Sequence, residues 1–396
     1  MDAMAAPPLE RLQARNDATE LWWDSLPASF PAWKECLIAS APPERRPVVE
    51  RDLTRFWERV RGCTTNPRLV QEALGMNPEA WSGVVRALAE QAATTDPEAL
   101  YWQLYQDVFR QNALLLRPLW ERSAGRHGWL CAQLLPTVSF QAEAMVTQGL
   151  ALSELAPNLM IKVVGSEQGY EAIEALTSRG IATNLTLSFS ASQIERGLEA
   201  LDRGLATARR DGVDLARWRA VLTFMMGRVG AEAELRQQAE SRGLPLGPED
   251  LRWAEVAVAR RLYERIQGQG ERIKLLLCSL KVDTGPEATT CFHLEKTQGI
   301  SAVYTVSPVF LSGVLAHAEA LSLSGDGYRE PVPGPVLDRL TQLPYFQQTL
   351  APHAIQPAEF GLQPAFLRGL QEVNTAYRET LDWIRLVLAD KETTHA

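Results

Sequence analysis

The chain of 396 residues is 46% hydrophobic and 22% charged, the composition of an ordinary globular protein with enough apolar material for a large core. Its net charge of −8 excludes the basic footprint of a nucleic-acid-binding protein, although a few local basic residues could still hold an anionic small molecule. No apolar run reaches membrane-spanning length, no hydrophobic signal core begins the chain, and five scattered cysteines form neither a zinc nor a disulfide pattern. We therefore expect a cytoplasmic protein without a metal, a nucleic-acid partner or a membrane partner.

The order of predicted elements indicates one repeating architecture. Residues 1–19 are rich in small residues and proline, and we expect a mobile leader there. From residue 20 onward, short apolar segments alternate with amphipathic helices, and helices fill the chain beyond about residue 311. Strands are predicted near residues 22, 62, 131, 161, 185, 222, 276 and 304. Eight alternating strands and helices predict a single α/β domain over residues 20–396, a (β/α)₈ TIM barrel with extra N-terminal and C-terminal helices.

The predicted strand near residue 161 carries an unusual side chain. Lys162 lies within the apolar run Leu159–Val164, a pattern typical of a parallel strand that is covered on both faces. Burial among apolar neighbours pushes a lysine towards its neutral form, and a neutral amine can attack a carbonyl group to form a Schiff base. A lysine at a strand end could instead extend its amine to solvent. The strand alone leaves both interpretations open.

Further polar side chains fall near the carboxyl ends of the predicted strands, where TIM barrels have their active sites. They are Asp24, Asn66, Gln133, Lys162, Asn184, Thr186, Thr223 or Arg228, and Lys281. Several also have a simpler explanation: Asp24 could cap the next helix, Asn66 and Asn184 could form local hydrogen bonds, and basic residues on surface loops are ordinarily solvated. Their coincidence at the strand ends favours a site.

Three motifs in this order resemble the transaldolase family of class I, Schiff-base-forming aldolases. WWDSL at 22–26 resembles that family's first-strand acid, and GCTTNP at 62–67 is close to its GVTTNP signature. Residues 158–190 resemble its Schiff-base strand, the following helix and its NxTLxFS strand. The match covers most of residues 20–310 and is similar in particular to the longer bacterial transaldolases.

The resemblance implies an enzyme that transfers a dihydroxyacetone unit between sugar phosphates without a cofactor. It implies that Lys162 forms the Schiff base, that Asp24 handles the proton of the hydroxyl beside the cleaved bond, and that Thr186 orients a catalytic water. Asn66 and Asn184 would hydrogen-bond substrate hydroxyls. The family also suggests the pentose phosphate pathway, a cytoplasmic location, and a monomer or homodimer.

Phosphate recognition follows from the same resemblance. Arg228 after the sixth strand, and Ser279 with Lys281 after the seventh, match the family's phosphate-binding positions. Thr223 replaces a serine that is usual near this arginine. A guanidinium and an ammonium group there would clamp a phosphate dianion at the mouth of the barrel.

Two departures from the family pattern affect the expected chemistry. Gln133 stands where the family's third strand carries a glutamate that exchanges protons through a water, and a glutamine can only orient that water. Fructose 6-phosphate aldolases also have Gln there, but they pair it with a tyrosine where this chain has Met225. The last seventy residues match the family poorly.

Three functions therefore stay open. They are a transaldolase, a diverged Schiff-base aldolase acting on another carbonyl substrate, and a catalytically impaired barrel that serves as a binding or scaffold protein.

Overall fold

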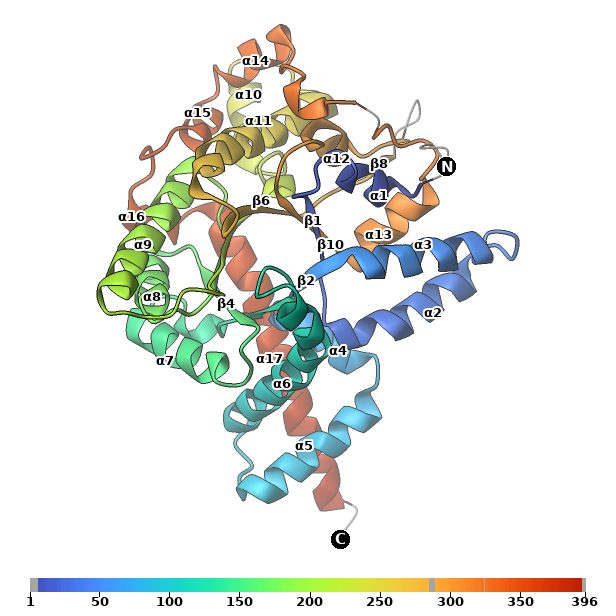
Figure 1. Cartoon of the computed structure of the whole chain (residues 1–396), viewed down its shortest axis with the longest axis vertical. Helices are drawn as coiled ribbons and strands as arrows, with labels where there is room; N and C mark the ends of the chain where they lie inside the picture. The colour runs from blue at the N-terminus through green and yellow to red at the C-terminus, as the bar shows by residue number, and fades with distance from the viewer. Residues whose placement is uncertain (1–5, 285–288, 324, 394–396) are drawn as a thin grey trace.

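In a computed structural model, the chain forms the predicted (β/α)₈ barrel (Figure 1). The structure describes residues 6–284, 289–323 and 325–393. Eight parallel strands close the barrel in the order β1-β10-β7-β6-β5-β4-β3-β2. They are β1 (Glu20–Trp23), β2 (Val60–Thr64), β3 (Trp129–Gln133), β4 (Leu159–Val164), β5 (Thr183–Thr186), β6 (Ala220–Met225), β7 (Ile273–Cys278) and β10 (Val303–Val306). Each strand lies where the sequence predicted one.

Helices surround the barrel and continue into the C-terminal tail (Figure 1). The surrounding helices are α2 (Phe30–Ser40), α3 (Arg46–Arg59), α4 (Pro67–Gly75), α5 (Pro78–Ala92), α6 (Pro97–Arg122), α7 (Ala142–Ser153), α8 (Glu167–Thr177), α9 (Ala191–Arg210), α10 (Ala233–Ser241), α11 (Pro248–Ile266), α12 (Phe292–Thr297) and α13 (Pro308–Ala316). The tail contains α14 (Gly334–Leu340), α15 (Pro344–Leu350), α16 (Pro357–Phe360) and α17 (Pro364–Thr393). A two-stranded hairpin of β8 (Asp283–Thr284) and β9 (Thr289–Thr290) was not predicted.

Part of the expected leader is helical. Helix α1 (Pro8–Gln13) buries Leu9 and Leu12 in the main hydrophobic core, and Arg11 donates to the backbone oxygens of Ala318 and Leu321. Residues 1–5 lie outside the described part of the chain. The mobility of the leader stays a prediction. Among the described helices, none has both the length and the apolar character to cross a membrane.

The strands are apolar on both faces because both faces are covered. Outward residues such as Ile161 and Val163 of β4 pack in the core beneath the helices. Inward residues form a separate layer that fills the barrel: Trp22, Cys131, Met160, Ala182, Val221, Leu276 and Val303. Gly62 of β2 makes room for the Trp22 ring, since a Cβ at position 62 would lie 2.6 Å from Trp22 Cε2.

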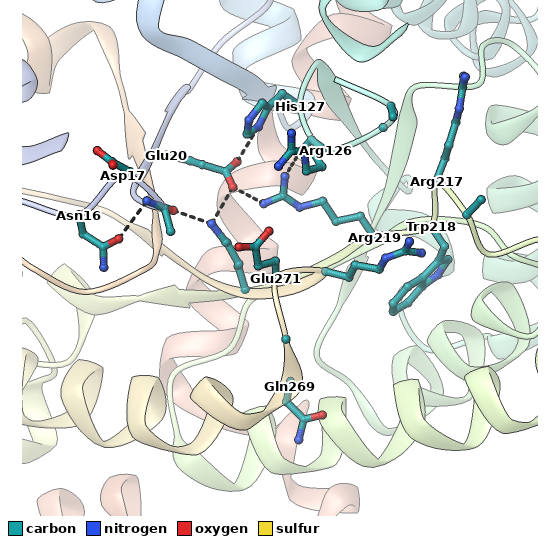
Figure 2. Close-up of a pocket in the computed structure, with 17 residues that line it drawn as sticks. Asn16, Asp17, Glu20, Arg126, His127, Arg217, Trp218, Arg219, Gln269 and Glu271 are labelled. Carbon is teal, nitrogen blue, oxygen red and sulfur yellow. Dashed lines mark hydrogen bonds and ion pairs between the residues drawn. The ribbon is translucent and has the colours of Figure 1, made fainter. Parts of the chain in front are cut away.

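A buried ion cluster closes the amino end of the barrel (Figure 2). Glu20 accepts hydrogen bonds from Arg219 at 2.6 Å, from Lys274 at 2.9 Å and from the Trp22 indole at 3.1 Å. Burial alone would raise the pKa of Glu20, but Arg219, His127 and Lys274 hold it well below its usual range. These residues line a cavity of about 910 Å³.

The long helix α17 packs against the carboxyl end of the barrel, and it lies behind the strands in Figure 1. It contacts α4, α5, α6 and the 3₁₀ turn η3 (Pro136–Val138) that follows β3. Tyr377 packs edge-on against Tyr101, and Glu379 accepts a hydrogen bond from Gln71 at 2.8 Å. The C-terminal tail therefore forms part of the wall around the strand ends.

Candidate active site

The register of the barrel brings three of the predicted polar residues into one row. Gln133 of β3 pairs with Lys162 of β4, which pairs with Asn184 of β5. Each lies two residues after an inward member of the apolar layer, and side chains alternate along a strand, so all three point into the barrel one layer nearer its carboxyl end. Thr186 lies one further step up β5, opposite Val164.

Lys162 is buried with 7% of its surface exposed, so its amine does not extend to solvent. The amine donates to the Thr65 backbone oxygen at 2.9 Å and to the Thr64 hydroxyl at 3.3 Å. No carboxylate of the described residues lies within 4 Å of it. Without a carboxylate partner among the described residues, the amine is not fixed in an ion pair, and it can reach the carbonyl group of a substrate.

Asp24 directly follows β1, where its backbone N–H donates to the Val306 oxygen at 3.0 Å. Burial raises the pKa of its carboxyl to about 6; Lys162 opposes this shift and Glu72 adds to it. The next helical turn, η2 (Pro27–Ser29), has Leu26 at its N-cap, so Asp24 does not cap it. The Asp24 carboxyl makes no hydrogen bond within the described chain and lies in the field of Lys162.

Asn184 is fully buried and held at both ends of its amide. Its oxygen accepts from the Thr223 hydroxyl at 2.7 Å, and its nitrogen donates to the Cys131 sulfur at 3.2 Å. Thr223 is itself buried in the wall of the barrel. Its hydroxyl therefore fixes Asn184, whereas the sequence placed it with Arg228 at the phosphate position.

The remaining polar side chains differ in how many of their hydrogen-bonding groups are free to bind a ligand. Asn66 caps α4, with its side-chain oxygen accepting from Leu69 N at 3.0 Å, which is the local role that an Asn-Pro sequence permits. The side chains of Gln133 and Thr186 are buried, and neither makes a hydrogen bond to any described residue. Their amide and hydroxyl groups are therefore available to a substrate or a water.

The predicted phosphate residues lie on two adjoining turns. Arg228 ends the 3₁₀ turn η4 (Met226–Arg228) after β6, and a Cβ at Gly227 would lie 2.1 Å from the Ser279 oxygen after β7. Burial lowers the pKa of Lys281, whose amine makes no ion pair with a described residue. Arg228 is already engaged, because both of its terminal nitrogens donate to Glu372 of α17, at 2.9 and 2.8 Å.

The described residues contain one cluster of possible metal ligands, and it lies away from the barrel interior. Glu195 and Glu199 of α9 approach His353, but each glutamate forms an ion pair with an arginine, Arg265 and Arg196 respectively. This cluster gives no support for a metal.

Four contributors to the site were not singled out from the sequence. Thr64 and Thr65 hold the Lys162 amine, Cys131 holds Asn184, and Glu372 holds Arg228. The two threonines lie inside the quoted GCTTNP motif, so their signal was present in the sequence. Glu372 lies in a tail without a recognisable motif, and nothing in the sequence marks it.

Comparison with known proteins gives one consistent result. The family model for transaldolase/fructose-6-phosphate aldolase matches residues 49–346. A transaldolase of Thiobacillus denitrificans is 30% identical over 276 residues, which is 66% of this chain and 75% of that protein. A transaldolase of Mycobacterium marinum is 27% identical over 269 residues, 65% of this chain and 71% of its own. Transaldolase 1 of Streptomyces avermitilis is 33% identical over 177 residues, 44% of this chain and 46% of its own.

Proposed function

Since the chain belongs to the transaldolase/fructose-6-phosphate aldolase family and is a transaldolase-like enzyme, we propose that it transfers a dihydroxyacetone unit between sugar phosphates through a Schiff base on Lys162. The observation that carries this proposal is the buried Lys162 amine, whose hydrogen-bond partners among the described residues are neutral oxygens, at the end of the barrel where TIM-barrel enzymes act.

The proposed reaction begins when the Lys162 amine attacks the ketose carbonyl and water leaves, which forms a protonated Schiff base. Asp24 takes the proton of the hydroxyl beside the bond to be cleaved. That carbon–carbon bond then breaks, its electron pair passes into the Schiff base to give an enamine, and the aldehyde product leaves. The enamine attacks an acceptor aldehyde, Asp24 returns the proton to the new hydroxyl, and water hydrolyses the Schiff base.

The state of Asp24 supports this role. With a pKa of about 6, its carboxyl is mostly ionised at neutral pH and yet close enough to that pH to release its proton again. The field of Lys162 favours the carboxylate, and the protonated Schiff base would preserve that positive charge during bond cleavage.

The other residues take supporting roles in the proposal. Thr186 and Gln133 hold the water that hydrolyses the Schiff base, since Gln133 lies in register with Lys162, Thr186 lies one step further towards the strand ends, and both have unused polar groups. Asn184 binds a substrate hydroxyl in an orientation that Thr223 sets, and Asn66 contributes its amide nitrogen. Arg228, Lys281 and Ser279 bind the phosphate. We place the enzyme in the cytoplasm and the pentose phosphate pathway, as a monomer or homodimer.

A second function, that of a diverged Schiff-base aldolase, is favoured by Gln133. The fructose 6-phosphate aldolases also have Gln at this position. Without a proton-exchanging side chain there, the balance between protonation of the enamine and its transfer to an acceptor need not be that of a transaldolase. The two functions share Lys162 and Asp24. They differ in the fate of the enamine, and the aldolase alternative acts on another carbonyl substrate.

One assay separates these two functions. Fructose 6-phosphate is supplied with and without erythrose 4-phosphate, and sedoheptulose 7-phosphate and glyceraldehyde 3-phosphate are both measured. The proposal predicts acceptor-dependent transfer. Release of glyceraldehyde 3-phosphate at the same rate with and without acceptor, and no transfer product, would assign the protein to the aldolase alternative.

A further inference from the structure

Two crossed ion pairs join α17 to the segment that follows β6. Arg228 pairs with Glu372, and Glu232 pairs with Arg368, so residues four apart on one segment meet residues four apart on the other. Glu232 is buried, with 1% of its surface exposed. The face of α17 that carries Arg368 and Glu372 is therefore docked on the turn that holds the proposed phosphate arginine.

The same face of α17 packs against the rim of the candidate site. A Cβ at Gly369 would lie 2.6 Å from Leu187 Cδ2, and Leu187 directly follows Thr186 in a left-handed conformation with φ of 52°. Phe366 contacts Phe140, which follows the turn after β3, at a ring distance of 6.0 Å. Glu372 thus extends from a part of α17 that lies over the strand ends.

The Glu372 carboxylate uses the guanidinium in the way that a phosphate would. It accepts one hydrogen bond from each terminal nitrogen of Arg228, the two-point geometry in which arginine binds both carboxylates and phosphates. The Arg228 and Glu372 side chains keep 34% and 40% of their surface exposed, so water reaches the ion pair and weakens it by screening. A phosphate dianion could therefore compete with Glu372 for Arg228.

We infer that Glu372 is a specificity-determining residue that competes with the substrate phosphate for Arg228 and so reduces the preference of this enzyme for phosphorylated donors over uncharged ketoses. This inference rests on the proposed function of Arg228 as a phosphate ligand. A carboxylate at this place disfavours a dianion by charge repulsion as well as by occupying the guanidinium, whereas an uncharged ketose donor such as fructose meets neither obstacle.

The binding test measures the affinity of inorganic phosphate by calorimetry for the wild type, Glu372→Gln and Glu379→Ala. Glu379 lies on the same helix and holds Gln71 instead of Arg228, so its variant controls for looser docking of α17. We expect Glu372→Gln to bind phosphate about tenfold more tightly, and the gain to vanish in Glu372→Gln/Arg228→Gln. Equal affinities of the wild type and Glu372→Gln, with both melting cooperatively, would overturn the inference.

The kinetic test compares kcat/KM for fructose 6-phosphate with that for fructose, which undergoes the same cleavage without a phosphate. Glu372→Gln is expected to raise the first about tenfold and to leave the second within about twofold. An equal change for both donors would overturn the inference. Failure of the proposed function has a different signature, because borohydride would then trap no donor on Lys162 in any variant while the phosphate affinities could still differ.

Discussion

The two ends of the barrel each bury a lysine, and they treat its charge in opposite ways. At the amino end, Lys274 is 6% exposed and pairs with Glu20 at 2.9 Å, and Arg219 shares the same carboxylate. At the carboxyl end, Lys162 is 7% exposed, and its hydrogen-bond partners among the described residues are Thr64 and Thr65. The two lysines are buried to the same extent, so they differ in whether the amine is paired with a carboxylate. An amine that is locked to a carboxylate serves structure, whereas one held by neutral oxygens can serve chemistry.

The amino end illustrates how a buried charge becomes structural. Glu20 joins β1 to β7 through Lys274 and to Arg219, the residue before β6, and Figure 2 shows its carboxylate turned towards Arg219 and His127. Removing one partner would leave the other charges buried and uncompensated. The cavity that these residues line is large, yet it lies at the amino end of the barrel, where side chains contribute to stability.

Exchange of each buried lysine for methionine tests the comparison most strongly. Lys162→Met is expected to lower transfer activity at least about a thousandfold while changing the free energy of unfolding by only about 1 kcal/mol, because methionine is of similar size. Lys274→Met is expected to cost about 3 kcal/mol of that free energy and to retain most of the activity. Urea denaturation and the transfer assay measure both. Loss of activity without loss of stability in Lys274→Met would break the comparison.

Asp24→Asn is the next largest expected effect. Loss of the proton-handling group should lower kcat/KM about 10² to 10⁴-fold. Because the Asp24 pKa is about 6 and the carboxylate is the active form, wild-type kcat/KM should fall as the pH drops below about 6, and this acid limb should vanish in the variant. The pH profile of kcat/KM measures this. An unchanged acid limb in Asp24→Asn would assign the limb to another group.

The same shift has a consequence for stability with a defined sign. The pKa of Asp24 in the folded protein lies above its ordinary value of 3.8, so ionisation favours the unfolded state. Its contribution to stability is therefore fully present below about pH 4 and is lost as the pH rises through about 6. Asp24→Asn should remove this part of the pH dependence, which is opposite in sign to that of Glu20.

Gln133→Glu is expected to have the smallest effect of these changes. It places a carboxylate in register with Lys162 and should raise the transfer rate about tenfold by supplying proton exchange through water. Gln133→Met is the matched control, because it keeps the length of the side chain and offers no proton exchange. A rate that stays the same in Gln133→Glu, with folding intact, would show that Gln133 does not limit the reaction.

The fold was predictable because its signal is repeated along the chain. Each strand is covered on both faces, so each gives an apolar run such as that around Lys162, and eight runs separated by helices allow few architectures. The β8–β9 hairpin was missed because strands of two residues have no measurable period. The end of the barrel that carries Gln133, Lys162 and Asn184 also followed from the rule for strand ends.

The hydrogen-bond and ion-pair partners of the site residues were much less predictable than the positions of those residues at the strand ends. Thr223 binds Asn184 within the barrel and not a group at the rim. Its hydroxyl points inward from the neighbouring strand and lies within hydrogen-bond distance of the Asn184 amide. Asn66 caps α4, which the Asn-Pro sequence had left open. Glu372 meets Arg228 across 144 positions of sequence, and a helical period does not reveal which distant turn a helix face will contact.

Reductive trapping tests the role of Lys162 most directly. The full-length wild type, Lys162→Met and Lys274→Met are each incubated with fructose 6-phosphate and borohydride, and the modified residue is located by peptide mass spectrometry. We predict a dihydroxyacetone adduct on Lys162 in the wild type and in Lys274→Met, and none in Lys162→Met. An adduct that persists in Lys162→Met, or no adduct in any of the three proteins, would contradict Lys162 as the Schiff-base nucleophile.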